Sequence, residues 1–588
     1  MRTFMRHFAV ALLVTGSSSQ FVPAPADLIT KEGYAGINVR YKEVPAGICE
    51  LDPNVKSYSG YADVDDDQHI FWWFFEARNQ DPTTAPLTVW INGGPGSSSM
   101  IGLFQELGPC GVGPDGKPFD NPYSWSNASN LLFIDEPTTV GFSYSIPIPA
   151  YKDSGGYIIQ LPNNTCPDYA EAVGTCGTYS KPNHTLTANS TEGAAPNMWK
   201  TLQGFMGAFP DYSSNGFNFA TESYGGHYAP VFNAYILDQN AKNISGAHPI
   251  QLENVLIGNG WFDPLVQYQA YYNFSVYPGN TYDYDPYNDT VKAEWYNNLY
   301  GEGNCLDQTK HCYATGQNSI CQRADDFCYN KVELPYDLYS GRDEYDMRYL
   351  VPDPFPYSYY VEYLNTPEVQ AAIGAFQNFS ESSSTVSSAF GNTGDDDRES
   401  GTIAACQKLL AAGVQVMLYY GDADYNCNWL GGQVVADEIA APGYDTAGFV
   451  NISTSDAIVH GQVKQSGLFS FLRIYESGHE VPFYQPLASL EIFARALKQV
   501  DVATGEVKIC DVADYKTVGS PTSTYREGNA TVQFEVTPAN ATYNTALNAP
   551  DPEPTWAAGA LEKRGSIGKR AGGRVGRPRR SKGGKRPA

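Results

Sequence analysis

The sequence has 588 residues, of which 42% are hydrophobic and 17% charged, so most of the chain can form a folded core rather than a disordered polymer. Lys and Arg total 38 against 64 Asp and Glu, a net charge of −26, which argues against nucleic acid as a partner because a phosphate backbone requires a basic face. Residues 563–588 hold eleven basic residues and no acidic one, so the rest of the chain is more acidic still, and low pH would relieve its self-repulsion.

Residues 1–19 have the pattern of a secretory signal peptide. Arg2 and Arg6 give a positively charged start, residues 8–14 form an apolar run, and residues 15–19 are small and polar. The alternative is a first buried helix. The apolar run is too short to cross a bilayer, and no later stretch approaches the ~20 apolar residues that a membrane-spanning helix requires. The sequence therefore predicts an exported protein with no transmembrane segment.

Glycosylation sequences and cysteines also favour export. Eleven Asn-x-Ser/Thr acceptor sequences occur, and they begin at Asn127, Asn163, Asn183, Asn189, Asn243, Asn273, Asn288, Asn378, Asn451, Asn529 and Asn540. The eleven cysteines predict disulfides in an oxidising compartment, and their odd number leaves at least one thiol unpaired. We expect secretion to the cell exterior, with a vacuolar destination as the less favoured alternative.

Four of the cysteines form a local cluster, which consists of Cys305, Cys312, Cys321 and Cys328. Six, eight and six residues separate them, unlike the short Cys-x-x-Cys pairs of zinc sites. We therefore expect local disulfides rather than a metal site.

Five short apolar runs, each followed directly by a turn signal, predict buried strands. They lie at residues 86–91, 130–134, 217–220, 414–420 and 468–475. Segments rich in helix-forming residues lie between them, for example residues 406–412 and 487–500. Alternation of this kind predicts the α/β class, with a mostly parallel sheet covered by helices on both faces. In such sheets the chemistry gathers at the carboxyl ends of the strands.

Two stretches interrupt this alternation and are predicted to be insertions into a catalytic core of residues 47–270 and 393–510. The first, residues 145–196, reads as a loop insertion. The second, residues 271–392, is rich in Tyr, Asn and Cys and is expected to form a cap over the active face. Beyond the core we expect a C-terminal extension (511–562) and a basic, disordered tail (563–588).

A candidate nucleophile, Ser223, follows the third predicted strand. It stands in the sequence Thr221-Glu222-Ser223-Tyr224-Gly225, ahead of a helix that we expect to begin near Pro230. A strand–turn–helix elbow of this kind raises a serine hydroxyl above the sheet edge. The pattern is weak by itself, because Thr221 replaces the first glycine of the usual G-x-S-x-G motif.

A nucleophilic serine needs a base and an acid, which follow it in the order Ser, acid, His in α/β-hydrolases. Of the histidines that come well after Ser223, His311, His460 and His479, the last is favoured because it follows a long apolar run. The acid that would orient the imidazole and stabilise its protonated form is Asp422 or Asp424. Spacing alone does not separate these two.

Four motifs in this order closely resemble the serine carboxypeptidases of the α/β-hydrolase superfamily, especially the secreted fungal enzymes. They are residues 90–99 (WINGGPGSSS), 222–228 (ESYGGHY), 421–429 (GDADYNCNW) and 478–482 (GHEVP), and the likeness spans residues 47–510. The resemblance implies an α/β-hydrolase fold with a mostly parallel central sheet, flanking helices and a cap insertion. It also implies Ser223 as nucleophile, Asp424 as the acid and His479 as the base.

The resemblance assigns further roles at the site. Asn92, Gly93, Glu106 and Glu222 would bind the terminal carboxylate of the substrate. Gly94 and Tyr224 would offer backbone N–H groups to the oxyanion. Trp90, Cys427 and Glu480 would belong to the substrate pocket. Cys427 aligns with a cysteine that is free in some relatives, so it is our candidate for the unpaired thiol, with a disulfide as the alternative.

These residues together predict a serine-type carboxypeptidase that releases C-terminal amino acids from peptides and proteins through an acyl-enzyme. The two glutamates must share at least one proton to bind a carboxylate, so acidic pH should favour activity. No metal or organic cofactor is called for. The alternatives are an acyltransferase on the same scaffold and a catalytically inactive binding protein. The sequence makes no prediction of side-chain preference or oligomeric state.

Overall fold

The computed structural model describes residues 21–282, 284–351, 356–398 and 401–523, together with the backbone of residues 543–544 and 549–550. The predicted signal peptide and basic tail, and the sequons at Asn529 and Asn540, lie outside the described residues. No helix in the described part of the chain is long and apolar enough to span a membrane.

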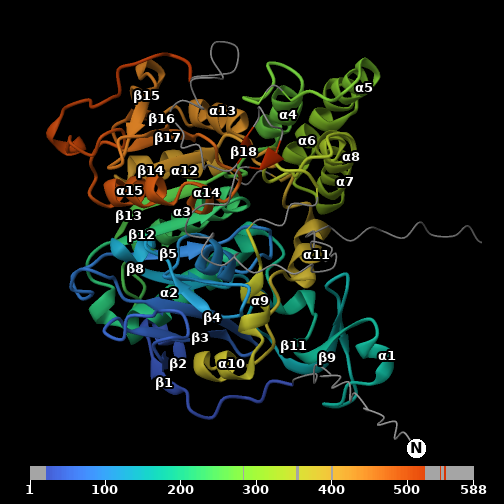
Figure 1. The fold of residues 1–588 in the computed structure, drawn as a ribbon, viewed down its shortest axis with the longest axis vertical. Coiled ribbons are helices and arrows are strands. Elements are labelled where there is room, and N and C mark those ends of the chain that lie inside the picture. Colours follow the sequence, from blue (N-terminus) through green and yellow to red (C-terminus); the bar gives the residue numbers. More distant parts are fainter. Residues whose placement is uncertain are drawn as a thin grey trace, which may run out of the picture.

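A twelve-stranded sheet forms the centre of the molecule (Figure 1). In spatial order its strands are β1 (Ile29–Glu32), β2 (Asn38–Val44), β3 (Ser57–Asp65), β4 (Gln68–Phe75), β8 (Asn130–Ile134), β5 (Leu87–Ile91), β12 (Phe217–Glu222), β13 (Leu252–Gly258), β14 (Gln415–Gly421), β17 (Phe469–Ile474), β16 (Val459–Ser466) and β15 (Val450–Ser453). The six strands from β8 to β17 are mutually parallel. Antiparallel strands complete the sheet at both ends.

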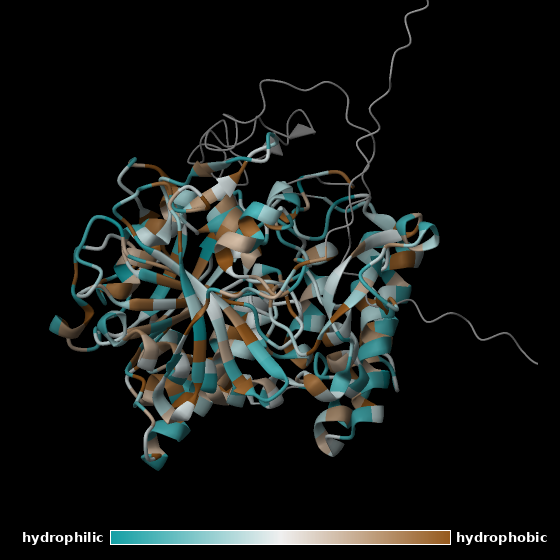
Figure 2. Ribbon diagram, turned by 90° about the horizontal axis from the view of Figure 1, so that it is seen from below, coloured by the Kyte–Doolittle hydropathy of each residue, from teal (hydrophilic) through white to brown (hydrophobic). Residues whose placement is uncertain are grey.

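The central strands separate two hydrophobic cores. Along β5, Val89 and Ile91 point into one core and Trp90 into the other, as the two-residue period of a strand requires. Helices α2 (Thr191–Ala208) and α3 (Gly225–Lys242) contribute to the first core, and α15 (Pro486–Leu497) to the second. Figure 2 shows hydrophobic residues on the strands and on the helix faces packed against them. Burial on both faces explains why these strands appear in the sequence as continuous apolar runs.

The five predicted strands are present as β5, β8, β12, β14 and β17, with ends shifted by at most two residues. The two predicted helices are present as α15 and α12 (Thr402–Ala411). The start of the helix after Ser223 was predicted wrongly, because α3 begins at Gly225 and contains Pro230 within its second turn. Pro230 has no N–H to donate to the carbonyl of Gly226, so it costs the helix one backbone hydrogen bond without ending it.

The predicted loop insertion at 145–196 is also more regular than expected. It contains a separate antiparallel sheet in the order β10 (Ile158–Gln160), β9 (Pro147–Asp153) and β11 (Gly174–Ser180), followed by the start of α2. The short helix α1 (Asp168–Glu171) precedes β11. A disulfide joins Cys166, just before α1, to Cys176 in β11. Two small apolar clusters form here, and so small a core is consistent with the loop-like composition of the segment.

The second interruption is largely helical (Figure 1). Its helices are α4 (Pro264–Ser275), α5 (Asp289–Tyr300), α6 (Cys305–Thr315), α7 (Asn318–Cys328), α8 (Pro335–Tyr339), α9 (Tyr359–Leu364), α10 (Pro367–Ile373) and α11 (Ser384–Thr393). Its parts lie in different places, because α10 packs against β2 and β3 while α5 to α8 lie at the other end of the view. Disulfides join Cys305 to Cys328 and Cys312 to Cys321, and so staple α6 to α7. The prediction of local disulfides in this cluster is confirmed.

Candidate active site

Ser223 occupies a sharp turn between strand β12 and helix α3. Its backbone has φ of 62°, in the left-handed region that is unfavourable for a serine. Three backbone hydrogen bonds hold this conformation: Ser223 donates to Gly258 (3.0 Å) and accepts from Gly226 (2.9 Å) and Trp261 (2.8 Å). A strained and firmly held serine at a strand–helix junction is the geometry of a nucleophile elbow.

Thr221 fits this elbow although the usual motif has glycine at its position. Its hydroxyl donates to the carbonyl of Ile91 on the neighbouring strand, at 2.7 Å. The threonine fills the space beside Gly225, where an added Cβ would lie 2.0 Å from the Thr221 hydroxyl. The elbow therefore tolerates a side chain at residue 221 because residue 225 has none.

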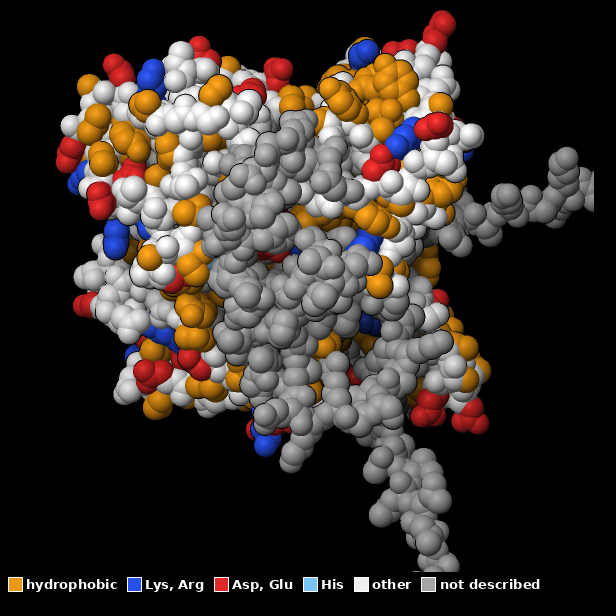
Figure 3. Space-filling model, turned by 45° about the horizontal axis from the view of Figure 1, so that its top comes forward, with side chains coloured by type: hydrophobic (Ala, Val, Ile, Leu, Met, Phe, Trp, Pro, Cys, Tyr) orange, Lys and Arg blue, Asp and Glu red, His pale blue; other side chains and the backbone are white. Residues whose placement is uncertain are grey.

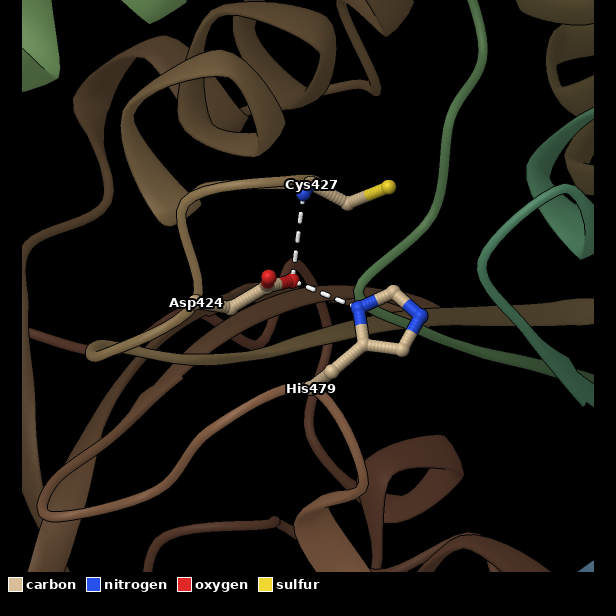
Figure 4. A group of neighbouring side chains, drawn as sticks. All are labelled: Asp424, Cys427 and His479. Atoms are coloured by element: carbon tan, nitrogen blue, oxygen red, sulfur yellow. Dashed lines mark hydrogen bonds and ion pairs between the residues drawn. The ribbon is translucent and has the colours of Figure 1, made fainter. Parts of the chain in front are cut away.

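The carboxyl ends of β14 and β17 bring Asp424 and His479 together. Their Oδ2 and Nδ1 atoms lie 2.7 Å apart, and both side chains are buried. Figure 4 shows the second ring nitrogen, Nε2, on the side of the imidazole away from Asp424. The same Asp424 oxygen accepts hydrogen bonds from the backbone N–H of Cys427 (3.2 Å) and from Nδ2 of Asn259 (2.8 Å). This pair is arranged to receive a proton at Nε2.

The other candidates for acid and base lie elsewhere. Asp422 accepts hydrogen bonds from the hydroxyl of Tyr282 and from Arg473, so its carboxylate faces away from His479. His460 contacts Asp456 and Gln485. His311 is exposed on α6. The structure therefore separates Asp422 from Asp424, which spacing in the sequence does not.

Electrostatics at His479 reflect its ion pair. Burial by itself lowers the pKa of a histidine, but Asp424, with Glu222 and Glu480 nearby, raises the pKa of His479 to about 9. The negative neighbours thus stabilise the imidazolium that forms when a serine gives up its proton.

Two buried carboxyl groups, Glu106 and Glu222, lie next to Asn92. The amide of Asn92 is fixed from both sides: its oxygen accepts from Trp90 Nε1 (2.8 Å) and from the backbone N–H of Gly102 (3.0 Å), and its Nδ2 donates to Glu222 (2.8 Å). Burial raises the pKa of Glu222 to about 7. Burial, followed by the charges of Glu222 and Glu480, raises the pKa of Glu106 well above its usual range. The pair therefore tends to retain a proton.

The glycine-rich loop after β5 packs closely on the elbow. A Cβ added at Gly93 would lie 2.4 Å from the backbone nitrogen of Tyr224, and Gly94 has φ of 114°, which favours glycine. This close approach places the backbone of the loop beside Tyr224. The Tyr224 hydroxyl donates to buried Asp395 at 2.7 Å, which anchors the residue from below.

Of the three predicted pocket residues, Trp90 is completely buried, packs at right angles to Trp125 and donates its indole N–H to Asn92, so its link to the site runs through Asn92. Cys427 is unpaired, as predicted, and its thiol lies beside the side chain of Ser223. Burial and the charge of Asp424 raise the pKa of this thiol. Glu480 is partly exposed next to His479.

The remaining cysteines and sequons can now be placed. Cys49 pairs with Cys110, while Cys406 and Cys510 are free in addition to Cys427. Most sequons within the described residues are exposed or half-buried. Asn378 is the exception and a correction: it is buried, and its amide bonds to Thr178 and Asn365, so a glycan there is incompatible with this fold.

Reasoning from the sequence did not find Asn259, which follows β13. It lies in the left-handed region (φ of 39°) and holds Asp424, while its own oxygen accepts from Gly421 at 3.0 Å. The Asn259-Gly260 turn after an apolar run was a signal that could have revealed the strand and this residue.

Known proteins resemble this chain over most of its length. The family model for serine carboxypeptidases matches residues 47–499. Carboxypeptidase S1 homolog B of Arthroderma otae is 38% identical over 550 residues, covering 86% of this chain and 83% of the relative. Carboxypeptidase S1 of Penicillium janthinellum is 37% identical over 467 residues, covering 78% of this chain and 99% of the relative.

A solved structure has the same fold. The prohormone-processing carboxypeptidase KEX1(DELTA)P of Saccharomyces cerevisiae matches with a TM-score of 0.59 at 22% identity, covering 82% of this chain and 97% of its own. This confirms the predicted α/β-hydrolase fold. The chain belongs to the serine carboxypeptidase family.

Proposed function

We propose that this serine carboxypeptidase removes single residues from the C-termini of peptides and proteins through an acyl-enzyme on Ser223. The observation that carries the proposal is the buried Asp424–His479 pair beside the Ser223 elbow, with the Glu106–Glu222 pair next to it. In the first step the Ser223 hydroxyl attacks the scissile carbonyl carbon, and its proton passes to Nε2 of His479. The leaving amine then takes this proton, and water hydrolyses the ester by the same route.

The negative oxygen of the tetrahedral intermediate would be stabilised by backbone N–H groups of Gly94 and Tyr224. The tight packing of the glycine-rich loop on Tyr224 supports this assignment. Each preorganised donor of this kind commonly contributes about 3 kcal/mol to the lowering of the barrier.

Recognition of a free C-terminus would be the task of Asn92, Gly93, Glu106 and Glu222. A carboxylate would be repelled by two ionised glutamates, but a protonated carboxyl group donates a hydrogen bond to it. The Asn92 amide keeps its N–H groups turned toward the glutamates because its oxygen is occupied by Trp90 and Gly102. These donors explain why the enzyme would cleave only the last peptide bond.

Activity on free-carboxyl peptides is favoured in acid under this proposal. The glutamate pair must be protonated, while His479 must be neutral to accept a proton. Ionised Glu222 is one of the charges that raise the pKa of His479, so a proton on the glutamate pair also favours neutral His479. A proton on the pair therefore supplies the donor for the substrate carboxylate and lowers the pKa of His479, and activity should decline as Glu222 ionises through about pH 7.

The rival activity is acyl transfer, in which an alcohol rather than water attacks the acyl-enzyme. The buried glutamate pair favours peptides, because an ester acyl donor without a free carboxylate would gain nothing from it. An inactive binding protein is disfavoured because the strained Ser223 and the ion-paired His479 would serve no purpose in it.

A pair of blocked dipeptides tests the proposal, identical except for a free or an amidated C-terminus. We expect preferential cleavage of the free acid at about pH 4.5, where Glu222 is protonated, over about pH 7, where it is about half ionised, and no cleavage by S223A. Equal cleavage of both would leave a serine hydrolase without terminal recognition. Labelling by a fluorophosphonate without cleavage would favour the acyltransferase, and failure to label would favour an inactive scaffold. A kcat/KM that peaks above about pH 8 would contradict the glutamate argument.

We also propose that the enzyme acts outside the cell, with the vacuole as the alternative. The signal-peptide pattern at residues 1–19 and the sequons support export. Detection of activity in culture medium rather than in a vacuolar fraction would separate the two destinations.

A further inference from the structure

Residues 343–349, here called the bridging segment, lie between the two loops that carry Asp424 and His479. The backbone N–H of His479 donates to the carbonyl of Tyr345 at 2.9 Å, and the N–H of Met347 donates to the carbonyl of Ala423 at 2.9 Å. One short segment of the helical insertion is thus bonded both to the catalytic base itself and to the residue before the catalytic acid.

Further contacts hold the bridging segment against both loops. The carbonyl of Glu344 accepts from the N–H groups of Tyr425 and Asn426, both at 3.0 Å, immediately after Asp424. The ring of Tyr345 lies edge-on to the imidazole of His479, with centroids 5.0 Å apart. The contact leaves no free space, because a Cβ added at Gly478 would lie 2.6 Å from the Tyr345 carbonyl oxygen.

A buried arginine fixes the shape of the bridging segment. Arg348 is 1% exposed; its Nε donates to Asp346 at 2.7 Å and its Nη1 to Glu476 at 3.2 Å. Glu476 stands at the start of the His479 loop with φ of 50°, in the left-handed region. The arginine therefore ties the segment to the base of that loop.

Buried ion pairs seldom add net stability, because desolvation of the charges offsets their attraction, but they do specify one arrangement of the chain. The ion pairs of Arg348 hold the segment between the loops that carry Asp424 and His479, where a single arrangement matters most. The strand ends fix only the start of each loop. The direct bond between the loops, Ala423 N–H to Ser477 carbonyl at 2.8 Å, leaves His479 itself two residues further on.

Building on the catalytic roles proposed above, we propose that the bridging segment, held by Arg348, is a positioning element that sets the orientation of His479 toward Asp424 and Ser223. Arg348 touches neither substrate nor reacting atoms in this role; it acts through the backbone of Tyr345 and Met347.

The test is Arg348→Lys, which keeps the buried charge but loses the planar fork that reaches Asp346 and Glu476 at once. We expect kcat to fall by about tenfold to a hundredfold, as is typical of a small misplacement of a catalytic group, while KM changes by less than about twofold. The rate of fluorophosphonate labelling, which requires no substrate carboxylate, should fall by a similar factor.

Arg78→Lys is the matched control. Arg78 makes the same two-pronged contact with buried Glu50 (2.9 Å for each bond), but at the amino end of the sheet. Arg78→Lys should lower the melting temperature without changing kcat. If Arg348→Lys does not fold, the neutralised variant D346N/R348M/E476Q removes the charges together and takes its place.

The proposal is overturned if folded Arg348→Lys or its substitute, counted by titrated active sites, keeps the wild-type kcat and labelling rate. It is also overturned if KM rises in place of a fall in kcat, since the segment would then shape a binding site. Wild-type cleavage of the free-carboxyl dipeptide and its loss in S223A are measured in parallel, so failure of the proposed function is seen separately.

Discussion

Glu222 stands directly before the proposed nucleophile, Ser223, and this position gives one side chain two electrostatic roles. Its backbone ends β12, so its carboxyl group points to Asn92 at 2.8 Å, while its charge still acts on His479. Under the proposed roles, a proton on Glu222 provides a donor for the substrate carboxylate and also removes a charge that favours the imidazolium. Substrate binding and the acid–base state of His479 would then be coupled through a single residue.

Substitution of Glu222 by Gln should extend activity to higher pH. The alkaline limb should move up, because an amide donates at every pH, whereas Glu222 loses its proton near pH 7. The acid limb should stay in place, because Glu222 is already protonated there and places no charge beside His479. We expect the alkaline limb of kcat/KM on a blocked free-carboxyl dipeptide to shift up by about one pH unit.

The matched control for this profile is Glu253→Gln. Burial also raises the pKa of Glu253, but it lies at the amino end of β13, away from the site. Its variant should keep both limbs. A Glu222→Gln profile that matched the wild type would show that Glu222 does not govern the alkaline limb.

The proposed catalytic triad could be predicted from the sequence because its members follow apolar strands at the same edge of a sheet. Arg348 and Tyr345 could not, because they lie in a polar, irregular segment whose contacts with the His479 loop span more than 120 positions; Arg348 and Glu476 are 128 residues apart in the chain. The support that Trp90 gives to Asn92 could not be predicted either, because a place in a motif does not tell which face of the strand a side chain occupies.

At the scale of elements, the elbow shows how two neighbouring positions compensate. Thr221 bonds across to β5 through its hydroxyl, and Gly225 leaves room for it at the first turn of α3. A usual elbow has small residues at both places. Here one small residue suffices because the other side chain is anchored within the sheet.

Gly225→Ala should therefore destabilise the elbow, because the new Cβ would meet the rigid, β-branched Thr221 side chain at 2.0 Å. We expect a loss of about 2–3 kcal/mol of unfolding free energy, typical of overpacking, and a large fall in kcat. The double variant T221G/G225A should recover most of both, which urea unfolding and peptidase assays would measure.

Gly391→Ala serves as the control for the effect of alanine itself, since a Cβ there meets nothing within 4 Å in helix α11. Compensation between Thr221 and Gly225 is contradicted if G225A and T221G/G225A are equally impaired, because the new Cβ would then clash with a group other than Thr221.

The burial of each strand also explains which strands were not predicted from the sequence. The parallel strands are buried on both faces and so appear as apolar runs, whereas β2 has a mixed burial pattern with polar residues throughout. β13 is apolar only in its second half. In β9–β11 the hydrogen-bonded ladder forms around a minimal core, and no composition signal distinguishes such a sheet from a loop.

Across the whole molecule, the surface charges and the buried carboxyl groups both favour acidic pH. On the face shown in Figure 3 acidic and basic side chains are scattered, with no single basic region among the described residues of that face. Inside, burial raises the pKa of several carboxyl groups: that of Asp135 to about 6, that of Glu222 to about 7 and that of Glu136 well above its usual range. The folded protein therefore favours the protonated form of each of these carboxyl groups.

We predict that the folded protein is more stable near pH 5 than near pH 8.5. A carboxyl group whose pKa is raised by folding stabilises the native state at low pH, and this contribution is lost as pH rises through the folded value, about 6 for Asp135 and about 7 for Glu222. His479, with its pKa raised to about 9, acts in the same direction at higher pH, whereas His227, with its pKa lowered to about 4 by burial, opposes it. The balance favours acid by a few kcal/mol. Melting temperatures measured at constant ionic strength would check this.

Glu136→Gln isolates the contribution of one buried carboxyl group. Among the described residues neither oxygen of Glu136 has a hydrogen-bond partner, and burial alone accounts for the direction of its pKa. The amide removes the ionisation without removing a bond, so this variant should melt above the wild type at pH 8.5 and close to it at pH 5. An equal difference at both values of pH would mean that Glu136 has the same protonation in the folded and the unfolded state over this range, so that burial does not raise its pKa. A wild type more stable at pH 8.5 than at pH 5 would contradict the account of buried carboxyl groups as a whole.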